Sequence, residues 1–487
     1  MKPASPQQPR TLNARFTSGS ILRHVISMTA ATSIGLMSIF FVELADMYFI
    51  SLLGEEALAA AVGFSGAITF FVFSISIGLS IGLAAVVARV IGEGRSDQAK
   101  RTVFNGLVVS FVLMGIIALP VFFYTRELLM LVGAEGQALV YGIRYMQIIV
   151  PSLPVIAIGM SMGAVLRAIG EAKASMISTV AAGVINALLD PFLIFTLDMH
   201  IEGAATATLI ARLVMVIIAA VNLGRYMGVS VFWPQGGLYH DILAISRIAL
   251  PASLTSLATP FANSYVTTSV AHHGSDAVAG LAIISRIIPF AFGAVFALSA
   301  AIGPIVGQNI GAGATGRVQD ALKSSLLVIT GVVFATSTLL ALSARQIGEL
   351  FSVTGLSAEL VGFFCIFVSW SFVFTGAQFI ANATFNNINL APWSTFANWG
   401  KATLGTVPFI WLGDYYAGAK GIIAGQAIGA VIFGTISFIV AYRVVKRPVK
   451  EKGPQYFGAM LPAVLSQFGW QRFLEERWRV EEKKRDK

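Results

Sequence analysis

Acidic side chains inside apolar segments are the residues of this chain that could do chemistry. Glu43 and Asp46 lie three residues apart in one such segment, and Asp190 lies in another, four residues after Asn186. Residues three or four apart share one face of a helix. An ionised carboxylate at membrane depth costs at least about 2.5 kcal/mol, so each acid needs a proton or a cation partner. Two facing carboxylates would titrate as a coupled pair, as a proton or sodium switch requires.

Structural ion pairing is the alternative for each acid, because Arg144 and Arg212 also lie within apolar segments. A further charge, Lys401, lies about seven residues into a later segment. Lys401 could extend toward a membrane interface or face a cavity and tune the charge of a substrate. The polar and aromatic residues that could line such a cavity with it are Trp370, Trp393, Trp399, Gln378 and Asn382.

The elements that must position these residues are membrane-spanning helices. The chain has 487 residues, 56% hydrophobic and only 12% charged, whereas soluble domains carry about 25% charged residues. Runs of roughly 20 apolar residues are long enough to cross a bilayer. The apolar runs predict an all-α polytopic membrane protein with twelve helices, near residues 24–50, 58–88, 103–124, 138–162, 175–196, 204–224, 249–271, 278–305, 322–344, 360–384, 394–413 and 421–442.

The net charge of +9 is concentrated in the two ends of the chain, not in its body. Residues 1–23 hold four Lys/Arg and no acid, and residues 443–487 hold twelve Lys/Arg and six acids. The tails and one set of loops together hold 26 of the 33 Lys/Arg, which predicts that both termini are cytoplasmic. The opposite loops are expected to hold only Arg126, Arg286, Arg345 and Lys420.

An internal repeat relates the two halves of the chain. The stretch LLGEEALAAAVGF at 52–64 resembles HHGSDAVAGLAII at 272–284, and VIGEGRSDQAKRTV at 90–103 resembles NIGAGATGRVQDAL at 309–322. An offset of six helices makes the halves parallel repeats around a central cavity. We therefore expect a tail at 1–23, a six-helix lobe at 24–224, a cytoplasmic linker at 225–248, a second lobe at 249–442 and a basic tail at 443–487. Phe457, Leu461, Leu465 and Phe468 favour an amphipathic helix in that last tail.

One motif imitates a nucleotide site. Gly311, Gly313 and Gly316 match the GxGxxG fingerprint, but that fingerprint needs a preceding strand, and here it follows an apolar helix. We interpret it as a turn that ends a helix. With no P-loop, transport would run on an ion gradient or downhill. The single cysteine, Cys365, makes an internal disulfide impossible and argues against a cysteine metal cage. No cofactor is expected besides the coupling ion, H⁺ or Na⁺.

Longer stretches carry a family resemblance. VELADMYFISLLGEEALAAAVGF at 42–64, GAVLRAIGEAKASMISTVAAGVINALLDPFLIF at 163–195, GAATAT at 203–208 and ALPASLTSLATPFANSYVTT at 249–268 resemble the multidrug and toxic compound extrusion (MATE) family, over about residues 20–445. The resemblance implies twelve helices in two lobes, and export of cationic or amphipathic compounds in exchange for H⁺ or Na⁺. It also implies a site for the coupling cation, H⁺ or Na⁺, that involves Asp46, Asn186, Asp190, Thr208 and the carbonyl of Ala204, with Glu43 nearby.

The chain also departs from the family. Many members have a proline in the first span, where this chain has ISMTAATS, so a proline-driven bend of that helix is in doubt. Some members carry an acid in the seventh or tenth span, and here those spans have none, which argues against ion coupling through the second lobe.

The sequence therefore predicts a secondary multidrug antiporter of the bacterial inner membrane, not an enzyme. Its partners would be small-molecule drugs or toxic metabolites and membrane lipid, without nucleic acid, and the protein would be a monomer. The alternative within transport is a lipid-linked oligosaccharide flippase, although few intramembrane cations are available for its pyrophosphate. A membrane-embedded transferase is disfavoured because the five histidines are scattered over tails and loops.

Overall fold

The fold is built from helices joined by short turns. The computed structural model describes residues 12–234, 236–351 and 353–446, and these ranges contain no strand. The amphipathic helix expected near residues 456–480 lies outside the described residues. Up to Arg443, the helices described below belong to one compact unit.

The first half of the chain forms the helices that carry the predicted acids. Its helices are α1 (Ile21–Ser51), α2 (Glu56–Gly92), α3 (Ser96–Phe123), α4 (Thr125–Leu131), α5 (Gly136–Ile149), α6 (Leu153–Ala168), α7 (Ala172–Pro191) and α8 (His200–Met227). A short turn of 3-10 helix, Arg15–Thr17, precedes α1, and another, Val150–Ser152, connects α5 to α6. A π-helical turn, Phe192–Thr196, ends α7.

The second half repeats this order. Its helices are α9 (Leu238–Ala271), α10 (Ser275–Ala291), α11 (Gly293–Gly311), α12 (Thr315–Leu342), α13 (Ala344–Leu350), α14 (Gly355–Phe363), α15 (Phe372–Asn387), α16 (Ala391–Ala402) and α17 (Val407–Lys446). Both bounds of α12 lie 219 residues after those of α3, and the same holds for α15 and α6. The repeat seen in the sequence is therefore a repeat of structure.

The number of spans agrees with the sequence once two helix breaks are taken into account. Eleven helical segments among the described residues are long and apolar enough to cross a membrane. The longest, Ala391–Lys446, is interrupted by non-helical backbone at Ala417 and Gly418, so it contains both the eleventh and the twelfth predicted spans. The eighth predicted span is divided at Phe292 into α10 and α11, whereas its counterpart α2 is continuous.

The GxGxxG stretch is a connection between helices, as the sequence analysis interpreted it. Gly311 ends α11, Gly313 has a positive φ of 69° in the turn, and Gly316 lies in the first turn of α12. Gly94 has the same role after α2, with a φ of 76°. A left-handed turn is the conformation that glycine adopts without strain, and the order of helix, turn and helix is not that of a dinucleotide fold.

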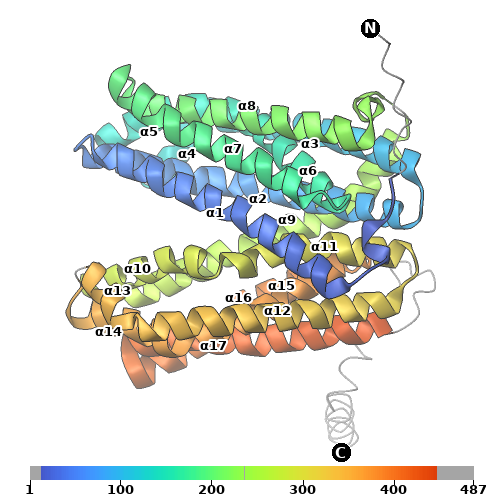
Figure 1. Cartoon of the computed structure of the whole chain (residues 1–487). Helices are drawn as coiled ribbons and strands as arrows, with labels where there is room; N and C mark the ends of the chain where they lie inside the picture. Colours follow the sequence, from blue (N-terminus) through green and yellow to red (C-terminus); the bar gives the residue numbers. More distant parts are fainter. Residues whose placement is uncertain (1–11, 235, 352, 447–487) are drawn as a thin grey trace, which may run out of the picture. The chain divides into compact units, whose positions relative to one another are not determined.

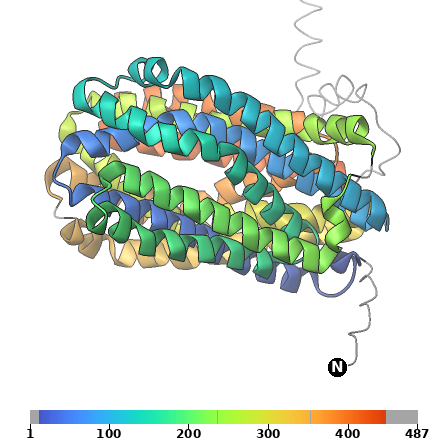
Figure 2. The same ribbon diagram turned by 90° about the horizontal axis from the view of Figure 1, so that it is seen from above.

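The two halves meet along α1 and α2. Helix α1 packs against α7 of its own half and α11 of the other, and α2 packs against α9 and α11. Figures 1 and 2 show the helices running side by side in one general direction. We call the end at which α2 and α11 finish and α9 starts the linker end, because the connection between the halves lies there. The connection is shorter than predicted, since α8 continues to Met227 and α9 begins at Leu238.

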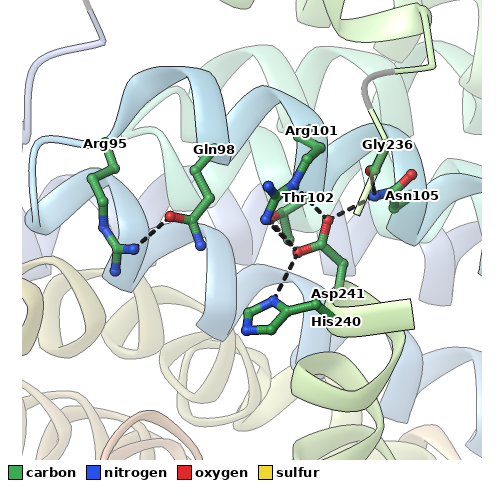
Figure 3. Close-up of polar contacts among 8 residues, drawn as sticks. All are labelled: Arg95, Gln98, Arg101, Thr102, Asn105, Gly236, His240 and Asp241. Atoms are coloured by element: carbon green, nitrogen blue, oxygen red, sulfur yellow. Dashed lines mark hydrogen bonds and ion pairs between the residues drawn. The ribbon is translucent and has the colours of Figure 1, made fainter. Parts of the chain in front are cut away.

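A buried carboxylate fixes the start of α9 to the first half. Asp241 is 1% exposed and accepts hydrogen bonds from the Arg101 guanidinium at 3.1 and 3.2 Å, and from the Asn105 amide at 2.7 Å. The Thr102 hydroxyl donates a fourth bond at 3.3 Å (Figure 3). Because buried charges are stable only when they are paired and hydrogen-bonded, this cluster ties the second half to α3.

Candidate functional site

The fold brings the two predicted aspartates together. Asp46 lies on α1 and Asp190 on α7, and the packing of these helices places the two carboxyl groups within hydrogen-bonding reach of each other. Asp46 Oδ1 and both carboxylate oxygens of Asp190 are buried and receive no donor from any described residue. Two carboxylates are both acceptors, so a proton or a cation has to lie between them for the contact to be favourable.

Asn186 adds an unpartnered amide on the same helix face as Asp190. Its side chain is 1% exposed, and neither its oxygen nor its nitrogen has a hydrogen-bond partner among the described residues. Buried amides are almost always hydrogen-bonded. The unsatisfied polar atoms of Asp46, Asn186 and Asp190 therefore indicate a site that binds a further group.

Helix α8 supplies a positive charge that the sequence analysis treated only as a structural alternative. Arg212 is 9% exposed, its guanidinium donates to the Ser152 hydroxyl and lies 5.4 Å from the Phe73 ring centroid, and its charge acts on Asp46. Arg144 instead pairs with Glu202, at 3.4 Å. Arg212 thus offsets part of the acidic charge, but one arginine cannot neutralise two carboxylates.

Tyr145 is a neighbour that the sequence analysis missed. It lies on α5, and its hydroxyl is close enough to interact electrostatically with Asp46, Asp190 and Arg212. No local signal distinguishes it from the other aromatic residues of the span. Its place in the site follows only from the packing of α5 against α2 and α8.

The remaining predicted members of the site are arranged around the aspartates. Ala204 is 2% exposed and Thr208 is half-buried; both lie on α8, at four-residue spacing with Arg212, so the three share one helix face. Glu43 lies one turn before Asp46 on α1, with an exposed side chain on which the charge of Asp46 acts. Among the described residues, no group of three or more His, Cys, Asp or Glu could hold a metal ion. The oxygens present suit a proton or a small hard cation.

A second polar cluster lies between α15 and α16. The Ser394 hydroxyl donates to the Asn382 carbonyl at 3.2 Å, and the Gln378 amide donates to the Ala397 carbonyl at 3.3 Å. Lys401 is half-buried and seven residues beyond Ser394, which places it on the helix face that meets α15. The side-chain oxygen of Asn382 is buried without a donor from any described residue.

The predicted tryptophans have separate environments. Trp399 donates to the Leu254 carbonyl at 3.0 Å and packs on Phe261, with ring centroids 5.5 Å apart, so it joins α16 to α9. Trp393 is half-buried on α16. Trp370 donates to the Ile366 carbonyl at 2.9 Å and contacts Phe334 of α12, which directs it away from the cluster around Ser394.

The expectation that Arg286 lies in a loop is wrong. Arg286 is eleven residues beyond the first residue of α10, with an exposed side chain that forms no hydrogen bond or ion pair with a described residue. Phe290, one turn later on the same face, contacts Phe41 of α1 at 5.2 Å between ring centroids. The apolar run at 278–305 already contained Arg286, so the span prediction agrees with α10 and only the assignment of Arg286 to a loop is overturned. At membrane depth, an unpaired arginine faces water rather than lipid.

Comparison with known proteins identifies the family. The MatE family model matches residues 31–192 and matches again at residues 251–412, so the second match lies 220 residues after the first. The chain belongs to the MATE family. Its members are efflux transporters, and this chain is accordingly an integral membrane protein with the family's fold.

Full-length relatives support this assignment. The chain is 31% identical over 447 residues to a protein named FAD transporter from Shewanella oneidensis, covering 89% of this chain and 97% of the relative. It is 21% identical over 442 residues to the multidrug export protein MepA of Staphylococcus aureus, covering 88% and 95%. The Vibrio cholerae MATE transporter VcmN in its bent form superposes with a TM-score of 0.83 at 26% identity, covering 88% and 98%.

Proposed function

We propose that this MATE transporter is a secondary active exporter that moves small organic molecules out of the cell in exchange for H⁺ or Na⁺. The observation that carries the proposal is the contact between Asp46 and Asp190, whose buried oxygens lack donors. Two carboxylates beside the single guanidinium of Arg212 leave one negative charge, and one proton or one Na⁺ would balance it. Such a site can bind and release one cation per cycle, which is the requirement for coupling.

We further propose that residues 24–224 and 249–442 move as two lobes of a monomer in the bacterial inner membrane, with the linker end in the cytoplasm. The distribution of Lys and Arg supports this orientation. Opening the linker end and closing the other would expose the site to alternate sides of the membrane, as expected for transporters built from repeats.

The test is efflux from proteoliposomes with an imposed pH gradient, repeated with an imposed Na⁺ gradient. Export driven by one gradient, and abolished when that gradient is collapsed, is the expected result and identifies the coupling ion. Equal export with and without either gradient would contradict the proposal.

A second candidate concerns the substrate, which could be an organic anion such as FAD instead of a cation. Two basic residues of the second half favour an anionic substrate. Arg286 is exposed within α10, and Lys401 is half-buried within α16. The acids of residues 249–442 all lie near helix ends, at Asp276, Asp320, Glu349, Glu359 and Asp414. The relative from Shewanella oneidensis is named for FAD, an organic anion, so its name is consistent with an anionic substrate. Parallel uptake of FAD and of a cationic dye into inverted vesicles distinguishes the two candidates.

A further inference from the structure

We propose that the turn Arg15–Thr17, which precedes α1, is a latch that holds the two halves together at the linker end and releases when that end opens. We call this turn the N-terminal latch. The proposal rests on the alternating exposure inferred above, but its contacts are independent of the ion site. Its central residue, Phe16, is 3% exposed although it lies outside the helix bundle's regular helices.

The backbone of Phe16 is bound by the second half. Its N–H donates to the Gln308 side-chain oxygen at 3.0 Å, and its carbonyl accepts from the Asn309 amide at 3.0 Å and from the Arg317 guanidinium at 2.9 Å. Arg317 also donates to the carbonyls of Ser18, at 3.1 Å, and of Gly19, at 3.2 Å. The end of α11 and the start of α12 thus hold the turn through three side chains.

The same turn is also bound by the first half, to which it is covalently attached through α1. Arg15 forms an ion pair with Glu171 at 2.5 Å. The Phe16 ring lies against Gly170, where an added Cβ would be 3.5 Å from the tip of the ring. Gln308, which accepts from Phe16, also donates to the Ala168 carbonyl at 2.8 Å. Phe16 therefore fills the junction between the end of α6 and the end of α11.

The latch lies at the end that must separate for inward opening. Close by in the fold, Arg89 at the end of α2 donates to Asn389 at 2.8 Å and to the Asn387 carbonyl, so α2 also contacts the connection after α15. The Asp241 cluster differs from these contacts, because it flanks the covalent linker and can persist as the halves rotate (Figure 3). Separation of α2 and α6 from α11 would break the contacts of Phe16, whose backbone groups could then bind water.

The experiment measures how often the linker end opens. Asn387→Cys, in a Cys365→Ser background, places a reporter thiol at the contact of α2 with α15, where Asn387 is 3% exposed. The full-length protein in nanodiscs is labelled with a hydrophilic maleimide. Phe16→Ala keeps the backbone hydrogen bonds but removes the buried ring, and Arg317→Gln removes the guanidinium donors. We expect each variant to raise the labelling rate at least about fivefold, because a buried aromatic ring or one net hydrogen bond contributes at least about 1 kcal/mol. Arg23→Gln, an exposed arginine in the first turn of α1, is the matched control and should leave the rate unchanged.

Two results would overturn the proposal. Unchanged labelling in both variants would mean that the turn does not restrain the opening. The native Cys365, buried within the second half, serves as an unfolding reporter when the Asn387→Cys change is omitted. If the variants raised the labelling rates of both thiols equally, the contacts of Phe16 would stabilise the whole fold and would not act as a latch. Because labelling needs no substrate or gradient, failure here is distinguishable from failure of the proposed ion coupling.

Discussion

Gly92 and Gly311 lie on facing helices, and each is pressed against the backbone of the other's helix. A Cβ on Gly92 would lie 2.1 Å from the Gln308 carbonyl oxygen, and a Cβ on Gly311 would lie 2.1 Å from the Arg89 carbonyl oxygen. The two glycines are equivalent in the repeat, so the contact between α2 and α11 is reciprocal. Close approach of two backbones requires residues without a side chain, which explains why glycine stands at this position of the apparent nucleotide fingerprint.

The first prediction concerns this contact. Gly311→Ala should force α2 and α11 apart and destabilise the closed linker end by about 1–3 kcal/mol, since the obstructing atom is backbone. Faster maleimide labelling of the Asn387→Cys reporter is the measurement. Gly316→Ala is the control, because its added Cβ would meet nothing within 4 Å. Unchanged labelling in Gly311→Ala, or saturable binding of ATP or NAD to the purified protein, would contradict our interpretation of the motif.

The second prediction concerns the ion site. Asp46→Asn and Asp190→Asn should each abolish gradient-driven efflux while the protein still reaches the membrane, because an amide cannot exchange a proton and binds a cation poorly. Dye efflux per unit of protein in membrane vesicles is the readout. Asp97→Asn provides the same chemical change at a side chain that is 98% exposed, and it should retain efflux. Near-normal coupled efflux in both site variants would remove the aspartates from the mechanism.

The third prediction tests whether Lys401 selects substrates by charge. At ~8 Å and an effective dielectric of ~20, a unit charge contributes about 2 kcal/mol, or roughly 30-fold in affinity. Lys401→Gln should therefore tighten binding of a monocationic dye, weaken binding of FAD and leave a neutral compound unchanged. Affinities for the three compounds in wild type and variant are compared. Lys420→Gln, whose lysine pairs with Glu359 at 2.8 Å, is the control. Equal shifts for all three compounds would show that Lys401 does not act through charge.

The fourth prediction concerns the attachment of α9. Asp241→Ala removes the acceptor of Arg101 and Thr102, while the Asn105 amide keeps the Gly236 carbonyl. Because Arg101 remains 27% exposed, the expected cost is that of lost hydrogen bonds to a charged group, about 1.5–3 kcal/mol. The melting temperature should fall by several degrees. Glu349→Ala removes an ion pair with Arg345 whose side chains are 62% and 87% exposed, so its effect should stay within about 1 kcal/mol. Similar melting temperatures for both variants would contradict a tethering role for Asp241.

The fifth prediction concerns pH. The Ser357 hydroxyl, together with the Ser357 and Leu356 N–H groups, holds the pKa of Asp276 below its ordinary value of 3.8. A lowered pKa means that the stabilisation is present above the unfolded pKa and is lost as pH falls through the folded value. Asp276→Asn should thus be less stable than wild type near pH 7, and the difference in melting temperature should shrink below about pH 4. A difference that is constant with pH would contradict this linkage.

Much of the fold was predictable because a bilayer imposes local constraints. The length of each apolar run determines whether a helix can span, so the runs indicated the spans, including the two separated at Gly418. The cost of a buried charge singled out Asp46 and Asp190 without knowledge of their surroundings. The offset of about 220 residues indicated the repeat that α3 and α12 display.

Only the tertiary structure decided which helix faces meet. Asp46 and Asp190 become neighbours because α1 packs on α7, and Arg212 and Tyr145 join them because α8 and α5 turn those residues inward. Helix periodicity gives the residues of a face but not the partner of that face, which depends on the packing of all helices together. For the same reason, Phe16 appeared to belong to a polar tail, yet the structure buries it between the ends of α6 and α11.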